Sequence, residues 1–325
     1  MKLYIKIPLI LISLILLIAI AGVIYLKIAF PKVSAAQNMK VKLTPERIAR
    51  GKYLAENVAM CVDCHSTRNW EYFSGPLLPG TIGKGGEVFD KSMGLPGTIY
   101  SKNITPFNLS SWTDGEIYRT ITCGVNKNNE PLFPVMPYQS YALMDPEDVM
   151  AIIAYLRTLS PINSSQPEHD LDIPMNMIVN TIPKDAQPTK RPPSTDTIAY
   201  GRYMVQIAAC AECHTPAVKG KQIEGMDFAG GFEFALPKGG KVRSVNITPD
   251  NETGIGKWTL TDFINKFKNY SSDEAKKIKV NAGEYNTIMP VTQYAGLTTE
   301  DLTAMYKFLR TVKPVHNKVE RFSKQ

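Results

Sequence analysis

The chain has 325 residues, of which 44% are hydrophobic, and its formal net charge is +7 at pH 7. This length is sufficient for two domains that each bury a core, and the composition excludes wholesale disorder. The positive charges form no basic stripe interleaved with aromatic residues, so we expect no nucleic-acid partner. We interpret the mild positive excess as steering encounters with an acidic protein.

The chain begins with an apolar segment that we predict to be a membrane anchor. Residues 7–26 carry no charge and match the roughly 20 residues that an α-helix needs to cross a bilayer. The segment is longer than the roughly 7–15 apolar residues of a cleavable signal peptide, although Val-Ser-Ala at residues 33–35 offers an alternative, a cleavage site. We therefore expect residues 1–42 to form a retained, single-pass N-terminal anchor followed by a short stalk.

A pentapeptide with two cysteines and a histidine occurs twice, as Cys-Val-Asp-Cys-His at residues 61–65 and Cys-Ala-Glu-Cys-His at residues 210–214. Cysteines three positions apart lie on about one helical turn, so both sulfurs can bond one flat macrocycle, and the histidine can ligate the metal beneath it. This pattern predicts covalent attachment of c-type haem, here two haem c groups. A split zinc site or a pair of dithiols are the alternatives, but neither requires a histidine at that position twice. The predicted attachment residues are Cys61, Cys64, Cys210 and Cys213, and the predicted axial histidines are His65 and His214.

Haem attachment also predicts the topology of the anchor. Lysines flank both ends of the apolar segment, so the positive-inside rule decides little. Attachment of c-type haem takes place outside the cytoplasm. We therefore expect the N-terminus inside and the haem domains in the periplasm, held at the inner (cytoplasmic) membrane of a bacterium.

Further motifs recur in the same order in both halves of the chain. They are Asn-Ile-Thr-Pro, Trp-Thr, Met-Pro and Leu-Arg-Thr, at residues 103–106, 112–113, 136–137 and 156–158 and again at 246–249, 258–259, 289–290 and 309–311. The threonine of each Trp-Thr pair predicts a helix start, because an acid, Glu116 or Asp262, follows three residues later. Asp145 and Thr298 predict the starts of two closing helices.

The repeats indicate an internal duplication, and we predict two tandem domains over residues 43–160 and 194–315. Between them, residues 161–193 hold seven prolines, which predicts a stiff linker. Its apolar run, residues 173–179, is expected to lie across the domain junction. Residues 316–325 are expected to form a tail.

A haem iron bound by one histidine needs a sixth ligand or leaves an open position. The remaining histidines, His169 and His316, fall in the linker and the tail, where solvated side chains are usual. Met136 and Met289 precede the prolines of the two Met-Pro pairs, and proline forces the residue before it out of a helix. We predict these two as the axial partners, since a His/Met pair raises the potential of a haem. Alternatives on or near the closing helices are Met144, Met150 and Met305.

Three stretches resemble the haem domains of the cytochrome c subunits of membrane-bound alcohol and gluconate dehydrogenases. They are Asn-Ile-Thr-Pro-Asp-Asn-Glu-Thr-Gly-Ile-Gly-Lys-Trp at residues 246–258, Tyr-Ser-Lys-Asn-Ile-Thr-Pro at 100–106 with Trp112, and Pro-Val-Met-Pro-Tyr at 134–138. The resemblance covers both copies, roughly residues 43–315. Those subunits usually carry three haem domains, whereas this chain has two haem-binding pentapeptides.

The resemblance implies an all-α fold, two tandem class I cytochrome c domains after an N-terminal transmembrane helix. In each domain the first and last helices would cross, near Gly51 and Gly201. It also implies His/Met ligation and a periplasmic role in respiration. By resemblance, Asn103, Trp112, Asn246 and Trp258 line the haem pockets. The alternatives are ordinary core positions for the tryptophans and turn side chains for the asparagines.

These features favour an electron-transfer protein over an enzyme. Two six-coordinate haems leave no open site for a substrate, so the chain would pass single electrons from a respiratory donor to an acceptor. The expected partners are a dehydrogenase, a terminal oxidase or a small cytochrome, together with the membrane. Two alternatives are a diheme peroxidase-type enzyme, which needs one open iron, and a haem-bearing subunit of a terminal oxidase.

Overall fold

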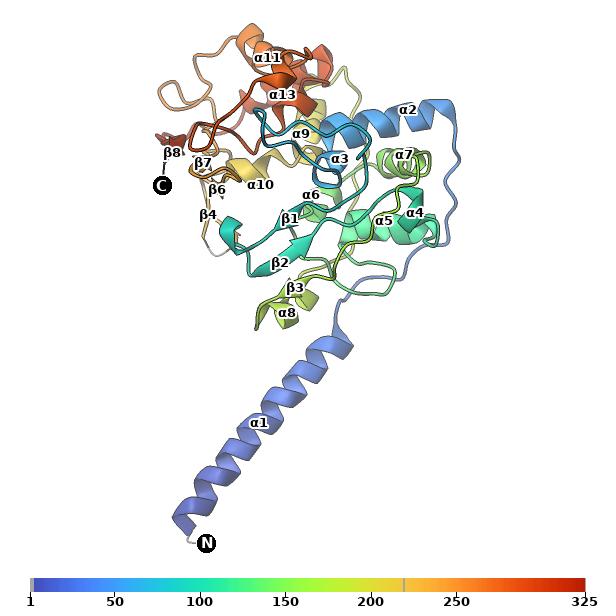
Figure 1. Ribbon diagram of the computed structural model, residues 1–325, viewed down its shortest axis with the longest axis vertical. Helices are drawn as coiled ribbons and strands as arrows, with labels where there is room; N and C mark the ends of the chain where they lie inside the picture. Colours follow the sequence, from blue (N-terminus) through green and yellow to red (C-terminus); the bar gives the residue numbers. More distant parts are fainter. Residues whose placement is uncertain (1–2, 219, 325) are drawn as a thin grey trace.

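The computed structural model describes residues 3–218 and 220–324. Residues 1–2 and Gln325, at the outer ends of the predicted anchor and tail, and residue 219 lie outside the described part. A long helix, α1 (Leu3–Ala29), projects from a rounded body (Figure 1).

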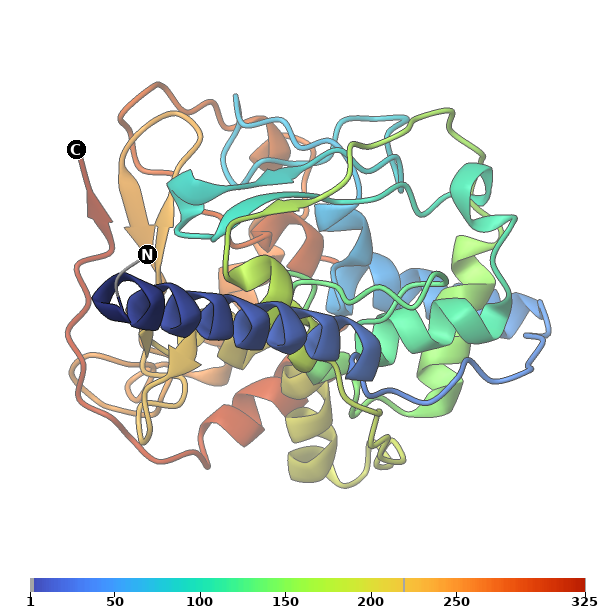
Figure 2. The same cartoon turned by 90° about the horizontal axis from the view of Figure 1, so that it is seen from below.

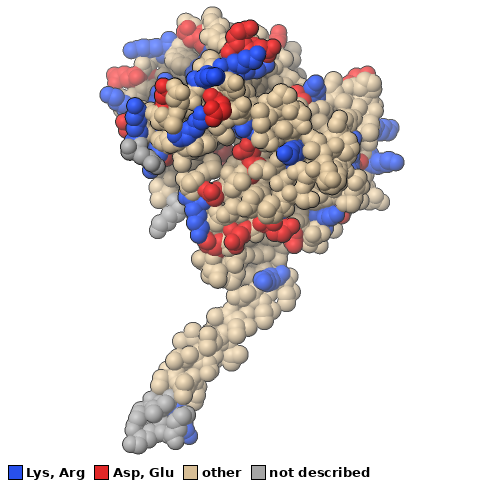
Figure 3. Space-filling view, in the orientation of Figure 1, with Lys and Arg blue, Asp and Glu red and all other residues tan. Residues whose placement is uncertain are grey.

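Helix α1 has the length and composition of a membrane span. Its segment Lys6–Ala29 has a mean hydropathy of 3.1 and is not buried against the rest of the chain. On the face shown in Figure 3, charged side chains gather near its two ends and are absent between them, whereas the body carries both signs of charge. These properties are those of a helix that can lie in lipid.

The apolar run at residues 173–179 lies beside α1 and not at the predicted domain junction. It forms a short helix, α8 (Met175–Ile178), and a 3₁₀ turn, η3 (Val179–Thr181), and both contact α1 where it meets the body (Figure 1). Val179 is buried, while Ile173 remains 78% exposed. The run therefore lies at the base of α1, and Val179 is its one buried residue.

The predicted stalk is packed onto the body. Val41 is buried, and its N–H donates to an oxygen of Asp114 at 2.7 Å. A Cβ on Gly115 would lie 1.8 Å from the carbonyl oxygen of Gln37, so only glycine permits this approach. The chain between α1 and the first helix of the body is thus fixed along the surface.

The first half is built from short helices whose starts follow the sequence. Thr44 caps α2. As predicted, Thr113 forms a capping box with Glu116 at α5, and Asp145 caps α7. Its helices are α2 (Pro45–Tyr53), the π-helix η1 (Leu54–Val58), α3 (Cys61–Cys64), α4 (Pro106–Leu109), α5 (Asp114–Cys123), α6 (Tyr138–Tyr141) and α7 (Pro146–Leu156).

The second half repeats this arrangement. Thr259 forms a capping box with Asp262, and Thr298 caps the last helix, again as predicted. Its helices are α9 (Thr197–Ile207), α10 (Cys210–His214), α11 (Leu260–Lys268), the 3₁₀ turn η4 (Ala275–Lys277), α12 (Val291–Tyr294) and α13 (Thr299–Leu309).

The first and last helices of each half cross at a glycine, which confirms the expectation for Gly51 and Gly201. A Cβ on Gly51 would lie 1.8 Å from the carbonyl oxygen of Ala151 in α7, and one on Gly201 would lie 2.0 Å from that of Ala304 in α13. At such a separation the backbones are in direct contact. A glycine is therefore required at both crossings.

The halves differ in how the first helix reaches the first cysteine. Cys61 follows Gly51 by ten residues, whereas Cys210 follows Gly201 by nine. The extra residue is accommodated as the π-helix η1, in which the N–H of Ala59 bonds the carbonyl of Leu54. An insertion of one residue is commonly absorbed in this way.

The predicted all-α class is incomplete, because the described residues also contain three small antiparallel sheets. The first pairs β1 (Val88–Phe89), β2 (Gly97–Tyr100) and β3 (Asp170–Leu171), with Val88 opposite Tyr100 and Gly97 opposite Leu171. The second pairs β4 (Ala217–Val218) with β5 (Lys221–Gln222). The third pairs β6 (Glu233–Ala235), β7 (Lys241–Arg243) and β8 (Phe322–Ser323), with Glu233 opposite Arg243 and Val242 opposite Phe322.

These strands lie in the loops that follow the pentapeptides, and the last strand of each three-stranded sheet returns from beyond the closing helix. Strand β3 belongs to the predicted linker and β8 to the predicted tail. The linker and the tail thus each contribute a strand to the fold of their own half.

The two halves lie side by side and share one hydrophobic core (Figure 2). Buried residues of the first half, such as Val58 and Met144, belong to the same cluster as Tyr203 and Leu297 of the second. A shared core fixes the relative position of the halves, because separating them would expose apolar surface to water.

Candidate haem sites

Each pentapeptide forms a single helical turn, and the backbone that precedes the turn has the same conformation in both halves. The preceding residues, Met60 and Ala209, adopt left-handed backbone with φ of 53° and 52°. Such a conformation is uncommon outside glycine and is retained mainly at functional sites. The carbonyl one residue earlier is bound by a tyrosine hydroxyl in both halves, Tyr141 at 2.5 Å and Tyr294 at 3.1 Å. Both turns are therefore held in one geometry, and neither cysteine pair forms a disulfide.

The two histidines are oriented alike. Nδ1 of His65 lies 2.6 Å from the carbonyl oxygen of Lys102, and Nδ1 of His214 lies 2.8 Å from that of Val245. A carbonyl only accepts, so Nδ1 carries the hydrogen and Nε2 keeps its lone pair for a metal. Burial lowers the pKa of both imidazoles, and this effect exceeds the opposite effect of the hydrogen bond to the carbonyl. The lowered pKa favours the neutral form of the imidazole, which is the form that binds a metal.

The Asn-Ile-Thr-Pro motifs fix those accepting carbonyls, since Lys102 and Val245 directly precede them. The Oδ1 of Asn103 accepts from the backbone N–H of Thr105 at 2.8 Å, and the Oδ1 of Asn246 accepts from that of Thr248 at 2.9 Å. Their Nδ2 groups donate to the carbonyls of Ile162 and Val315 at 2.8 and 2.7 Å. The asparagines thus act as turn residues, the alternative left open by the sequence, and their place in a haem pocket stays a prediction.

Gly85 and Gly230 belong to the sites and were not identified from the sequence. Their N–H groups donate to the carbonyls of His65 and His214 at 2.8 and 2.7 Å, and both have left-handed backbone. A Cβ on Gly230 would lie 2.4 Å from the carbonyl carbon of Val245. In the sequence, each of these glycines is the first residue of a Gly-Gly pair, and this repeated pair is the signal that could have identified them.

Trp112 carries a buried indole N–H that has no hydrogen-bond partner among the described residues. Its backbone carbonyl accepts from the guanidinium of Arg157 at 2.6 Å, whereas that of Trp258 accepts from the hydroxyl of Tyr306 at 2.7 Å. An unpaired buried donor is destabilising unless a partner arrives. A carboxylate of a bound haem would provide that partner, so Trp112 fits the group that the pentapeptide predicts.

Met136 and Met289 lie in matching turns. The following prolines, Pro137 and Pro290, have φ, ψ of −78°, 53° and −79°, 63° and form inverse γ-turns. The carbonyls of Met136 and Met289 accept from the N–H groups two residues ahead, at 2.7 and 2.8 Å. Both methionines are partly buried at the edge of the core. The alternatives Met144 and Met305 are buried within the core, where a packing role accounts for their presence. Axial ligation by Met136 and Met289 stays a prediction.

The turn after each methionine reaches the pentapeptide of the other half. The side-chain amide of Gln293 donates to Asp63 at 2.8 Å, and the hydroxyl of Ser140 donates to Glu212 at 3.0 Å. Asp63 and Glu212 hold the same position in the two pentapeptides, as Ser140 and Gln293 do in the two helices that follow Met-Pro. The two attachment turns therefore lie against the shared junction of the halves.

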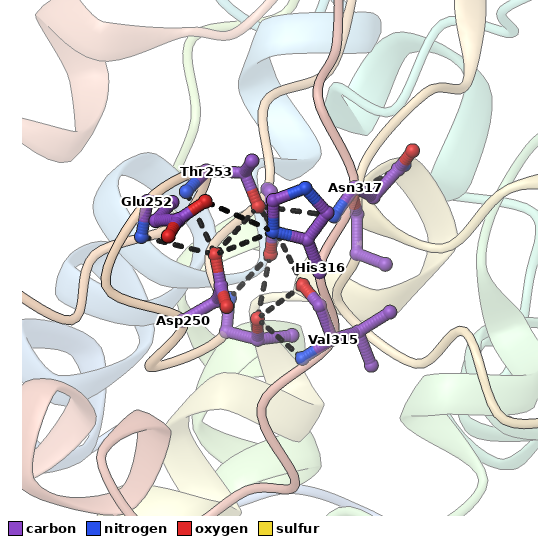
Figure 4. A network of polar contacts seen from close by, with 9 residues as sticks. Asp250, Glu252, Thr253, Val315, His316 and Asn317 are labelled. Carbon is purple, nitrogen blue, oxygen red and sulfur yellow. Dashed lines mark hydrogen bonds and ion pairs between the residues drawn. The ribbon is translucent and has the colours of Figure 1, made fainter.

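The remaining histidines have other contacts. The Nδ1 of His169 accepts from the N–H of Tyr100 at 3.2 Å. The Nδ1 of His316 lies 3.7 Å from an oxygen of Asp250 and of Glu252, in a polar network of the second half (Figure 4). Among the described residues no three His, Cys, Asp or Glu side chains gather as a metal site, so the four cysteines are not brought together as the zinc alternative requires.

Comparison with known proteins agrees with this geometry. Residues 198–313 match the family model for cytochrome c. The chain is 29% identical over 287 residues to the cytochrome c subunit of alcohol dehydrogenase (quinone) from Komagataeibacter europaeus, covering 82% of this chain and 56% of that protein. It is 27% identical over 286 residues to the gluconate 2-dehydrogenase cytochrome c subunit from Pantoea cypripedii, covering 82% and 59%. A diheme cytochrome c-type protein from Cereibacter sphaeroides is 27% identical over 173 residues, covering 48% and 53%.

These matches confirm the resemblance seen in the sequence. The second half contains a cytochrome c domain, which implies a covalently bound haem c, and homologues of the chain include cytochrome c subunits of dehydrogenases. The chain spans a little over half the length of the two dehydrogenase subunits.

Proposed function

We propose that this chain, a homologue of dehydrogenase cytochrome c subunits, is a membrane-anchored diheme cytochrome c that relays single electrons. The observation that supports two haems, rather than one, is the repeated histidine geometry, in which His65 and His214 each bond a backbone carbonyl through Nδ1. The first half repeats the attachment turn, the glycine crossing and the Met-Pro turn of the second. Because the first half repeats these features, the haem implied for the second half supports a haem in the first half.

The protein's own residues would hold and tune the cofactors. The two cysteine pairs would form the thioether links, and His65 with Met136 and His214 with Met289 would bind the two irons. A bound haem supplies reversible one-electron chemistry at its iron. The backbone carbonyls of Lys102 and Val245 orient the two imidazoles, and His214 is buried while His65 is partly buried.

The arrangement of the halves supports transfer of electrons within the chain. Each attachment turn is hydrogen-bonded to the methionine turn of the other half, through Asp63 and Gln293 and through Glu212 and Ser140. The shared core keeps this relation constant. An electron that enters one half would therefore have a fixed route to the other.

A dehydrogenase is the donor that the comparisons favour, because the relatives are named as subunits of alcohol and gluconate dehydrogenases. A terminal oxidase or a small cytochrome would accept the electrons. Helix α1 would hold the chain in the inner membrane with its haem domains in the periplasm, where c-type haem is attached.

The test is the ligation state of the full-length protein extracted in mild detergent. The ferric protein should be low-spin and show the near-infrared sulfur-to-iron band, and Met136→Ala or Met289→Ala should each remove the part of that band that belongs to one haem. Met144→Ala, a buried methionine outside the Met-Pro turns, is the matched control and should retain the whole band. A high-spin ferric haem with peroxidase turnover in the unmodified protein would contradict the relay and favour the enzyme.

A further inference from the structure

We infer that a loop of the first half positions the proposed axial methionine of the second half. This crossing loop, residues 68–75, leaves the first pentapeptide and packs against the turn that contains Met289. Within this loop, Ser74 is the main residue that positions the Met289 turn. The inference rests on the proposed role of Met289 as an iron ligand.

Ser74 is hydrogen-bonded to both sides of the Met289 turn. Its hydroxyl donates to the carbonyl of Met289 at 2.7 Å and accepts from the N–H of Val291 at 3.0 Å. Its own N–H donates to the side chain of Asn286 at 2.8 Å. One fully buried side chain of the first half therefore fixes the backbone before and after Pro290.

The rest of the crossing loop is anchored on both halves. The buried guanidinium of Arg68 bonds Asp63 of the first pentapeptide at 3.1 Å and the carbonyl of Ile288 at 3.3 Å. Tyr72 and Lys279 form an antiparallel bridge between the halves. Arg68 also stacks on Trp70, with its central carbon 4.1 Å from the ring centre. The loop is thus a rigid support for the Met289 turn.

The support is not reciprocal. Gly85 follows His65 by 20 residues, whereas Gly230 follows His214 by 16, so the second half has a shorter loop at this place. Among the described residues, the carbonyl of Met136 accepts only from the N–H of Tyr138 in its own turn. The sixth ligand of the second iron therefore depends on the first half, while the sixth ligand of the first iron does not depend on the second in this way.

The consequence is a difference in how readily the two methionines leave their irons. Movement of the Met289 turn away from its iron would break the two Ser74 hydrogen bonds across the junction. The Met136 turn has no such bonds at its carbonyl, and its contact with the other half is the hydrogen bond from Ser140 to Glu212. An added ligand that binds ferric iron after the methionine has left should therefore bind the second iron more slowly.

The test is cyanide binding to the ferric holoprotein, followed by absorbance, in the full chain and in Ser74→Gly. Ser74 has φ of 64°, which glycine adopts without strain, so this variant removes the hydroxyl and preserves the backbone. Loss of the two hydroxyl hydrogen bonds should accelerate one of the two cyanide phases roughly tenfold and leave the other unchanged. Met289→Ala identifies the phase that belongs to the second iron.

The outcomes separate this inference from the proposed ligation. Acceleration of the phase lost in Met289→Ala supports the positioning role of Ser74, and unchanged phases in a folded Ser74→Gly protein overturn it. Tyr203→Phe, which weakens the junction away from both methionine turns, is the matched control, and an equal acceleration in that variant would attribute the effect to general loosening and overturn the inference. If Met289→Ala itself leaves both phases and the sulfur-to-iron band unchanged, the ligation fails instead.

Discussion

Tyr203 in the second half donates its hydroxyl hydrogen to the buried carboxylate of Asp148 in the first half, at 2.7 Å. Tyr53 makes the reciprocal contact with Asp301. The two tyrosines hold the same position in the repeat, as do the two aspartates. The junction is therefore isologous, the arrangement found where identical surfaces meet across a two-fold axis, here within one duplicated chain.

The two aspartates differ in their remaining partners, and this predicts unequal costs of losing the tyrosines. Asp148 also binds the guanidinium groups of Arg50 and Arg191, at 2.9 and 2.6 Å. Asp301 has the hydroxyl of Tyr200 at 2.8 Å and no cation within 4.0 Å among the described residues. Tyr53→Phe should lower the free energy of unfolding by about 2–3 kcal/mol and Tyr203→Phe by about 1 kcal/mol, measured by urea denaturation.

The matched control for these two variants is Tyr270→Phe, whose ring stacks on Phe73 and whose hydroxyl makes no hydrogen bond in the described part of the chain. It should change the free energy of unfolding little. Equal losses for Tyr53→Phe and Tyr203→Phe would show that the arginines do not compensate Asp148.

Tyr200 predicts a loss of stability at high pH. Burial, aided by the carboxylate of Asp301, raises the pKa of Tyr200 from 10.0 to about 12. The unfolded chain then releases this proton at lower pH than the folded one, so stability is complete below pH 10 and falls as the pH rises toward 12. Urea unfolding from pH 8 to 12 should give a shallower decline for Tyr200→Phe, and identical slopes would refute the assignment.

The glycine crossings predict that neither half tolerates a methyl group there. Gly51→Ala and Gly201→Ala should each lower the free energy of unfolding by about 3 kcal/mol, because the new Cβ would meet a backbone carbonyl at 1.8 or 2.0 Å. Lys52→Ala, on the exposed side of α2, should be close to neutral. Thermal unfolding of the three variants checks this, and a stable Gly51→Ala protein would contradict the packing.

Trp112 predicts a difference between the two haems of the proposed protein. Trp112→Phe removes the buried N–H offered to a haem carboxylate, so the uncompensated negative charge should favour ferric iron and lower the midpoint potential of the first haem only. Redox titration followed by absorbance measures both potentials. An unchanged first potential, or an equal shift in both, would show that Trp112 has no such partner.

The features that the sequence predicted correctly depend on neighbours along the chain. The caps at Thr113, Asp145 and Thr259 require a side chain and a helix start within three residues. The glycine crossings at Gly51 and Gly201 came from resemblance to a family in which that packing recurs.

The features that the sequence did not predict are contacts between distant segments. The pairing of β3 and β8 with earlier loops joins pieces that local pattern describes as linker and tail. The contact of Ser74 with Met289 spans 215 residues and crosses between the copies, where no repeat pattern points to it. The extra residue behind the π-helix η1 was visible as a difference in spacing, but its effect on the helix required the structure.

The account depends most directly on the number of haems that the chain carries. Intact-mass spectrometry of the full-length protein, expressed with haem attachment in the periplasm and extracted in detergent, should give the mass of the polypeptide plus two haems. Replacing Cys61 and Cys64, or Cys210 and Cys213, with alanine should each leave the mass of one. A single haem on the unmodified chain, or none, would contradict the account.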